Sequence, residues 1–122
     1  MPDQTATMNV RHAATDIAVI EIAGDVTAAC DAQLAAAHQR ATDLGARGIL
    51  LDFSGLEYMN SGGIGMLVTL LVRTQRQKQR LAAVGLSDHY QQIFELTRID
   101  EAIILYPDER AALSAMSSGG AA

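Results

Sequence analysis

The apolar residues of this chain occur in short runs that alternate with longer segments of helical spacing. Each run is four to eight residues long and is bounded by glycine, proline or polar residues, which is typical of β-strands. Gly24-Asp25 is expected to end the second strand, and residues 54–59 are expected to connect the third strand to the next helix. We predict strands at residues 8–12, 16–23, 48–53, 81–84 and 102–105.

Apolar residues at helical spacing predict four helices. The clearest pattern begins near Ser61, where apolar residues recur at intervals of three and four positions through Val72. Gly45 follows the first helix, where a left-handed residue ends many helices, and Ser87 precedes the third, where a hydroxyl can cap the first turn. The predicted helices are residues 28–44, 61–80, 87–97 and 107–116.

This order of elements, ββαβαβαβα, predicts a single α/β domain over residues 8–116. Strands that alternate with helices need crossover connections, and such crossovers produce a mostly parallel sheet. The first two strands are close enough in sequence to be antiparallel, so we expect a mixed sheet. Residues 1–7 and 117–122 are predicted to be flexible tails.

Composition and charge exclude several classes of function. The 122 residues carry a formal net charge of −5, whereas nucleic acids and anionic membranes attract proteins with a basic surface. Cys30 is the only cysteine, which excludes an internal disulfide and a thiolate metal site. The first residues do not resemble an export leader, and no apolar run reaches the roughly 18 residues of a membrane span. We therefore expect a cytoplasmic protein that inserts into no membrane, binds no nucleic acid and uses no metal or cofactor.

The segment Asn60-Ser61-Gly62-Gly63, at the start of the second helix, is the most informative part of the sequence. Asn and Ser are among the best helix N-caps, so one of the two is expected to cap the helix. Capping does not explain Gly62, Gly63 and Gly65, because glycine inside a helix costs up to about 1 kcal/mol relative to alanine. A close approach of another segment, or access for another molecule, is needed to account for them.

Two chemical interpretations of this turn lack the residues they need. A phosphate-binding loop would require a Lys-Ser/Thr pair or a third glycine at the position of Val68, and neither is present. A nucleophile elbow would require glycine where Met59 stands. His12, His38 and His89 occur in contexts that indicate no base, and His38 is expected on a helix surface. We therefore predict no catalytic residue.

Phosphorylation of Ser61 is the remaining interpretation. The neighbouring glycines leave the hydroxyl open to a kinase, and a phosphate would add a charge of about −1.5 to −2 beside the N–H groups of the helix N-terminus. The domain could accept this group without unfolding, while a docked partner would meet like charge and a desolvation cost.

The pattern Leu51-Asp52-x-Ser54, followed by Ser61 and Gly63 before an apolar helix, resembles the signature of the STAS domain family, which includes the bacterial anti-sigma factor antagonists. The segments IAGDVTAACDAQL, GLSDHYQQIFELTRID and AIILYPDERAAL are also similar to parts of that family. The resemblance covers residues 8–115, nearly the whole chain.

The resemblance implies a fold, a function and partners. The fold would be a four- or five-stranded mixed sheet with helices packed on one side. The function would be that of an anti-sigma factor antagonist, which binds an anti-sigma factor and so releases a sigma factor. The anti-sigma factor would be a serine kinase that phosphorylates the residue matching Ser61 and thereby breaks the complex, and a serine phosphatase would reset it. On this interpretation the chain is a regulatory binding protein and kinase substrate, and not an enzyme.

Two residues depart from the pattern common in this family. Asn60 stands where Asp usually precedes the phosphorylated serine, which removes one negative charge from the site. This change could slow phosphorylation or favour the phosphorylated form, and its sign is open. Gly62 stands where Ser or Thr is common, so Ser61 is the sole hydroxyl of the turn.

The resemblance also implies a partner-binding surface around Ser61. A simple turn is the alternative role for the segment before the first helix, and core packing is the alternative for Ile64. Asp52 is equally compatible with a cap or turn acceptor, Ser54 with a turn, and the basic run 73–80 with a solvated helix end. The predicted surface comprises Asp25, Val26, Asp52, Met59, Asn60, Gly62, Gly63 and Ile64.

Two other functions stay open at this point. The chain could be a STAS scaffold or an accessory subunit of a membrane transporter, with Ser61 purely structural. It could also be a small nucleotide-binding module that uses the same helix N-terminus. The sequence predicts no oligomeric state.

Overall fold

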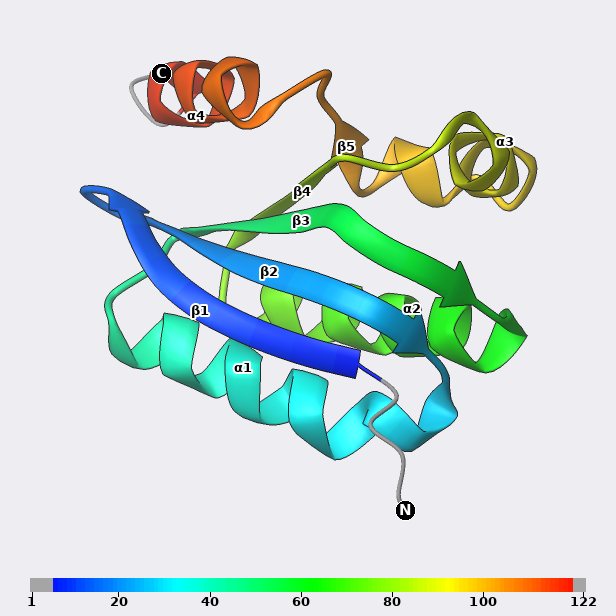
Figure 1. Cartoon of the computed structure of the whole chain (residues 1–122). Coiled ribbons are helices and arrows are strands. Elements are labelled where there is room, and N and C mark those ends of the chain that lie inside the picture. The colour runs from blue at the N-terminus through cyan, green and yellow to red at the C-terminus, as the bar shows by residue number, and fades with distance from the viewer. Residues whose placement is uncertain (1–5, 120–122) are drawn as a thin grey trace.

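A five-stranded sheet organises the chain, with its strands in the order β1-β2-β3-β4-β5 (Figure 1). β1 is antiparallel to β2, and every other neighbouring pair is parallel, which confirms the predicted mixed, mostly parallel sheet. The computed structural model describes residues 6–119. The strands are β1 (Ala6–Ala14), β2 (Ile17–Val26), β3 (Gly48–Met59), β4 (Arg80–Val84) and β5 (Ile104–Leu105).

Helices connect the parallel strands in the predicted order. α1 (Asp31–Asp43), α2 (Ser61–Arg76) and α3 (Asp88–Leu96) are these connections, and α4 (Glu109–Gly119) follows β5. Short 3₁₀ turns, η1 (Ala28–Cys30) and η2 (Ile99–Glu101), precede α1 and β5. Within residues 6–119, no helix combines the length and the apolar content that crossing a membrane requires.

The helices cover both faces of the sheet, which corrects the expectation that they pack on one side. α1 and α2 lie against one face and α4 lies against the other (Figure 1). Alternate residues of β2 follow this division: Ile20 belongs to the core under α1 and α2, whereas Ile17 and Val19 pack with Met116 of α4. Strands buried on both faces read as near-continuous apolar runs, as residues 16–23 do.

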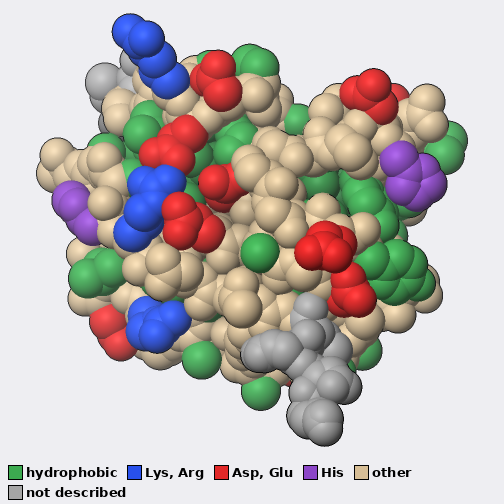
Figure 2. Space-filling view, in the orientation of Figure 1, with side chains coloured by type: hydrophobic (Ala, Val, Ile, Leu, Met, Phe, Trp, Pro, Cys, Tyr) green, Lys and Arg blue, Asp and Glu red, His purple; other side chains and the backbone are tan. Residues whose placement is uncertain are grey.

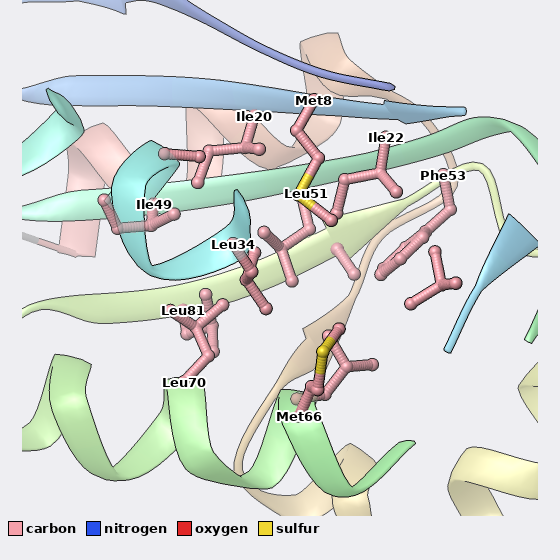
Figure 3. Close-up of a cluster of buried hydrophobic side chains, with 14 of the residues drawn as sticks. Met8, Ile20, Ile22, Leu34, Ile49, Leu51, Phe53, Met66, Leu70 and Leu81 are labelled. Atoms are coloured by element: carbon pink, nitrogen blue, oxygen red, sulfur yellow. The ribbon is translucent and has the colours of Figure 1, made fainter. Parts of the chain in front are cut away.

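The larger core lies between the sheet and the pair α1 and α2 (Figure 3). Ile20, Leu51 and Leu81, from three adjacent strands, are buried together with Leu34 of α1 and Leu70 of α2. Burying each such side chain contributes on the order of 2 kcal/mol through the apolar area removed from water. This core therefore fixes where α2 begins and ends relative to the sheet.

β2 and β3 are longer than the sequence predicts. β4 pairs with β3 only as far as Asp52, whereas β2 and β3 remain paired up to Val26 and Met59. Residues 54–59 are therefore strand and not a connector. Likewise, Gly24-Asp25 lies inside β2, so it does not end that strand.

Register shifts along this pair add residues to β3. The span Glu21 to Ala23 of β2 faces Asp52 to Gly55 of β3, which is one residue longer. A Cβ on Gly55 would lie 2.8 Å from the Ala23 Cβ, so glycine permits the close approach at this bulge. β-Bulges bend a strand and increase its twist. With these bulges, β3 stays paired with β2 up to Met59, just before α2 begins.

Several element boundaries differ from the prediction. β1 begins at Ala6 and α4 extends to Gly119, so the predicted tails 1–7 and 117–122 are too long at both ends. Residues 1–5 and 120–122 of these tails lie outside the described residues. α2 ends at Arg76 and not at residue 80, because the chain turns at Lys78, whose φ is 58°.

His38 is buried, which corrects its expected place on a helix surface. Its ring Nε2 lies 2.7 Å from the Gln79 Oε1. The Gln79 side-chain amide in turn donates to the Thr42 Oγ1 and to the Ala46 carbonyl, both at 3.0 Å. This buried polar group holds the C-terminal end of α1 against the segment that leads into β4.

Arg11 joins α4 to the sheet. Its Nε lies 2.9 Å from a carboxylate oxygen of Glu21, and its two terminal nitrogens contact the carboxylate of Glu109 at the start of α4. The hydrogen bonds to Glu109 and Glu21 raise the pKa of Arg11, and the hydrogen bond from Arg11 lowers the pKa of Glu21. All three groups are partly exposed, so solvent screening keeps their contribution to stability modest.

Candidate functional site

The start of α2 lies directly beside the end of β2. The last paired residues of the two long strands are Val26 and Met59, and the next backbone N–H, that of Asn60, donates to the Val26 carbonyl at 3.3 Å. α2 then begins at Ser61. The long β2–β3 pair therefore places the Asn-Ser-Gly-Gly segment at the end of the sheet, beyond β4.

Asn60 caps α2, and Ser61 does not. The Asn60 backbone is extended, and its side-chain Oδ1 accepts a hydrogen bond from the Gly63 N–H at 3.0 Å. The Asn60 carbonyl accepts the first helical hydrogen bond from the Ile64 N–H at 3.0 Å. One side chain thus satisfies the capping role that the sequence assigned to either residue.

Ser61 is exposed at the first helical position. Its hydroxyl makes no hydrogen bond to any described residue, although Ser61 directly follows the Asn60 cap. The N–H groups of Ser61 and Gly62 are among the first-turn donors that an α-helix leaves without an intrahelical acceptor. The site therefore combines a free hydroxyl with neighbouring N–H donors at the positive end of a helix dipole.

The glycines of this segment have different reasons for being there. A Cβ on Gly63 would lie 2.5 Å from the Val26 carbonyl oxygen, and one on Gly62 would lie 3.0 Å from the Ala28 Cβ. Both glycines therefore allow α2 to approach the end of β2 and the turn η1. Gly65 is exposed, and a Cβ there would meet nothing within 4 Å. Close packing accounts for two glycines but leaves Gly65 unexplained.

α3 supports the strand end that precedes the site. The Met59 backbone N–H donates to the Tyr90 hydroxyl at 2.9 Å. Phe94, one turn further along α3, meets Phe53 of β3 edge to face, with ring centroids 6.4 Å apart. These two contacts fix β3 where it is no longer flanked by β4.

The structure divides the predicted partner-binding residues into exposed and buried groups. Asp25 is exposed, but it lies in β2 and not in a loop. The side chains of Val26 and Met59 are only 1 % and 4 % exposed. This burial corrects their assignment to a partner-facing surface, because neither side chain can reach another protein in this conformation.

The remaining predicted residues have local roles. Asp52 accepts hydrogen bonds from the Ser54 N–H at 2.9 Å and the Ser54 hydroxyl at 2.6 Å, which matches its alternative role as a turn-type acceptor. Ile64 is half-buried against the larger core, and Gly63 is buried. Asn60 and Gly62 are half-buried beside Ser61.

The sequence-based prediction missed four exposed residues, three of them along α2 and one at the end of β3. Gly65, Val68 and Val72 follow Ser61 at intervals of four, three and four residues, so they extend along the same face of α2. Val68 and Val72 are 44 % and 42 % exposed, and Tyr58 at the end of β3 is 49 % exposed. The signal for Val68 and Val72 lies in this spacing, which served only to predict the helix. We call Ser61, Gly65, Val68 and Val72 the α2 stripe.

The charged residues visible in Figure 2 are unevenly distributed. In the half of this face where β2 and β3 end and α3 lies, the visible charged side chains of the described residues are acidic, accompanied by a histidine. Lys and Arg side chains appear only in the opposite half, among further Asp and Glu side chains. The part of the molecule that carries Ser61 therefore presents apolar and acidic groups on this side.

Comparison with known proteins gives consistent results. An anti-sigma-factor antagonist (STAS) domain protein from Planctomyces limnophilus is 26% identical over 93% of this chain and 99% of that chain, with a TM-score of 0.72. An anti-sigma factor antagonist from Mycobacterium paratuberculosis is 20% identical over 93% and 95% of the chains, with a TM-score of 0.76. The Bacillus cell fate determinant SpoIIAA, in its phosphorylated form, is 16% identical over 89% and 99% of the chains, with a TM-score of 0.68.

The similar structures show the fold, and comparison with sequence families assigns the chain to a family. No curated protein sequence matches the chain significantly. The family model described as the MlaB-type STAS domain matches residues 10–106, which include every strand of the sheet except the first residues of β1. The chain belongs to the STAS domain family.

Proposed function

We propose that this protein is an anti-sigma factor antagonist that binds a kinase-type anti-sigma factor and is switched by phosphorylation of Ser61. The observation that carries the proposal is the division of roles at the start of α2. Asn60 caps the helix, while the Ser61 hydroxyl is exposed and has no hydrogen bond within the described chain. A serine with no structural task at this position is available for modification.

The unmodified surface suits a docked protein. The α2 stripe is apolar beyond Ser61, and Tyr58 adds an exposed aromatic ring from the end of β3. Exposed Gly and Val along one face of α2 allow close, dry contact, and aromatic residues such as the exposed Tyr58 are enriched in interface cores. Gly65 leaves the helix backbone bare one turn after Ser61, which accounts for its presence as room for the partner.

A phosphate on Ser61 would be compatible with the fold and incompatible with this contact. The Ser61 and Gly62 N–H groups and the helix dipole can stabilise the added charge of about −1.5 to −2, so α2 stays formed. A partner covering the α2 stripe would have to desolvate that charge against Gly and Val. The complex then dissociates, and a phosphatase restores the binding surface.

The relatives support the proposal from outside the chain. One of the similar structures is an anti-sigma factor antagonist, a second is an anti-sigma-factor antagonist (STAS) domain protein, and the third is known in a phosphorylated form. On this proposal the protein is a regulatory binding protein and kinase substrate in the cytoplasm. Asn60, which stands at the position common for Asp in the family, provides the cap without adding charge next to Ser61.

The decisive experiment joins binding and modification. Tagged wild-type protein is used to isolate its partner from the source organism, and the partner is then purified and incubated with the protein, ATP and Mg²⁺. We expect a kinase-fold partner that phosphorylates Ser61, as read by mass spectrometry, and that releases wild type but retains Ser61→Ala. Ser61→Asp should lower the affinity for the partner by at least tenfold. Ser114→Asp, which adds an equal charge at an exposed position of α4, should bind as wild type does.

Two outcomes contradict the proposal. One is a purified partner that leaves Ser61 unmodified in the presence of ATP. The other is equal retention of Ser61→Asp and wild type. A transporter subunit as the purified partner, bound regardless of ATP, supports the scaffold or accessory-subunit alternative instead.

A further inference from the structure

A second candidate site lies at the opposite end of α2 from Ser61. A groove of about 460 Å³ opens at the edge of the sheet, between the last turns of α2 and the face of α4. Its walls are mostly apolar and include Leu71 of α2, Leu81 of β4, Ile104 of β5 and Met116 of α4. The volume falls within the range of small-molecule sites, roughly 300–1,000 Å³.

The shortness of β5 leaves this groove open. β5 pairs only with Ala82 and Ala83, so the first residues of β4, Arg80 and Leu81, have no β5 partner. Ile104 remains 52 % exposed beside them. The edge of β4 therefore forms the floor of a groove that a longer β5 would cover.

Arg80 is the one charged residue among those that line the groove. Within residues 6–119, its guanidinium forms no ion pair or hydrogen bond. Arg73, Arg76 and Lys78 precede it, also without ion pairs in the described chain, but none of them lines the groove, so Arg80 alone brings positive charge to it. The Gln79 amide, by contrast, is already bonded to Thr42 and Ala46.

We propose that this groove binds an amphiphile with one anionic head and an unbranched apolar tail, of the medium-chain fatty acid class. The tail lies along the apolar walls between α2 and α4, and the carboxylate pairs with the Arg80 guanidinium. A guanidinium matches a carboxylate through two parallel hydrogen bonds, which a solvated lysine cannot reproduce. A single lining cation specifies a head of one negative charge. The site is separate from Ser61 and does not depend on the proposed function.

Displacement of a fluorescent fatty acid by decanoate, below its critical micelle concentration, tests the proposal with the full-length chain. We expect saturable binding of decanoate and little displacement by decanol, which has the same tail without the charge. Arg80→Gln should weaken decanoate binding by about tenfold, the value of a charge-assisted pair. Arg76→Gln, which removes an equal charge outside the groove lining, should leave binding unchanged.

Ala115→Leu provides an independent test because it fills the groove from α4 without altering charge. Ala115 is exposed and Leu is a good helix former, so the variant should fold, which its thermal unfolding midpoint checks. Loss of decanoate binding in this variant supports the groove as the site. Absence of saturable binding to wild type overturns the proposal. So does decanoate affinity that is the same in Arg80→Gln or Ala115→Leu as in wild type.

Discussion

The Tyr90 hydroxyl accepts a hydrogen bond from the Met59 backbone N–H at 2.9 Å, and this contact ties α3 to the last residue of β3. Met59 immediately precedes the Asn60 cap and the Ser61 hydroxyl. The geometry of the candidate site therefore depends on a helix that lies elsewhere in the sequence. α3 acts as a support for the strand end and does not need to contact a partner itself.

Replacing Tyr90 by phenylalanine should weaken this support. The change removes only the hydroxyl and leaves the Met59 N–H in a partly buried position, so we expect a loss of about 1 kcal/mol in the free energy of unfolding. Urea denaturation measures this loss, and hydrogen exchange of the Met59 amide should become faster. Tyr58→Phe is the matched control, since the Tyr58 ring is half exposed and should tolerate the loss of its hydroxyl. Equal effects of the two changes would mean that the hydrogen bond is not important.

Substitution by alanine should destabilise the protein at Asn60 but not at Ser61. Asn60→Ala removes the cap of α2 and should destabilise the protein by about 1 kcal/mol. Ser61→Ala removes an exposed, unbonded hydroxyl and should change stability by less than about 0.5 kcal/mol. Denaturant unfolding of both variants compares them directly. A Ser61→Ala protein as unstable as Asn60→Ala would show that the hydroxyl has a structural role, against the proposed function.

Substitution by alanine should change the stability in opposite directions at Gly63 and at Gly65. Gly63→Ala places a Cβ 2.5 Å from the Val26 carbonyl oxygen and should cost about 1–3 kcal/mol, because backbone and not a flexible side chain must move. Gly65→Ala meets open space and should stabilise α2 by up to about 1 kcal/mol. If Gly65 provides room for a docked partner, the more stable Gly65→Ala protein should bind that partner more weakly. Tighter binding by this variant would remove that explanation of Gly65.

The cluster of Arg11, Glu21 and Glu109 predicts a pH dependence. The hydrogen bond from Arg11 lowers the pKa of Glu21 in the folded state, so its stabilising contribution is present above about pH 4.3, the ordinary pKa of glutamate, and is lost as the pH falls through the lowered value. The thermal stability of Arg11→Gln should therefore decrease less steeply than that of wild type as the pH falls through the acid range. Arg40→Gln, in an exposed position on α1, should keep the wild-type profile. Identical acid profiles for wild type and Arg11→Gln would contradict this account.

Local sequence signals predicted most of the fold. Apolar runs such as residues 48–53 and the helical spacing after Ser61 are strong because each element is buried against the sheet. Ser87 caps α3, with its hydroxyl accepting from the Tyr90 N–H, and Gly45 adopts φ 86° after α1, both as the sequence predicts. These features need only neighbouring residues to be recognised.

The features that the sequence did not predict depend on contacts between distant segments. Residues 54–59 contain Ser54-Gly55, which signals a turn, but pairing with β2 and the Gly55–Ala23 approach keep them in a strand. His38 lies in an alanine-rich helix that gives no sign of its partner, Gln79. The sequence also does not indicate which side of the sheet α4 covers. Only the packing of Met116 in the folded structure shows it.

At the candidate site, chemistry was easier to predict than exposure. Ser61 is open as its glycine neighbours suggested, and the sequence named Asn60 as one of two possible caps. Burial of Met59 and exposure of Val68 were both missed, because residue type alone does not reveal which side of an amphipathic element faces the solvent.

The separation of the helix cap at Asn60 from the proposed phosphorylation site at Ser61 also bears on how such domains diversify. With Asn60 responsible for the start of α2, the codon for residue 61 is free to change without endangering the architecture. A lineage can thus acquire, lose or retune a chemical switch by one substitution while keeping the same scaffold. Duplicated copies of this gene could diverge into constitutive and regulated forms that share one fold and differ at a single side chain.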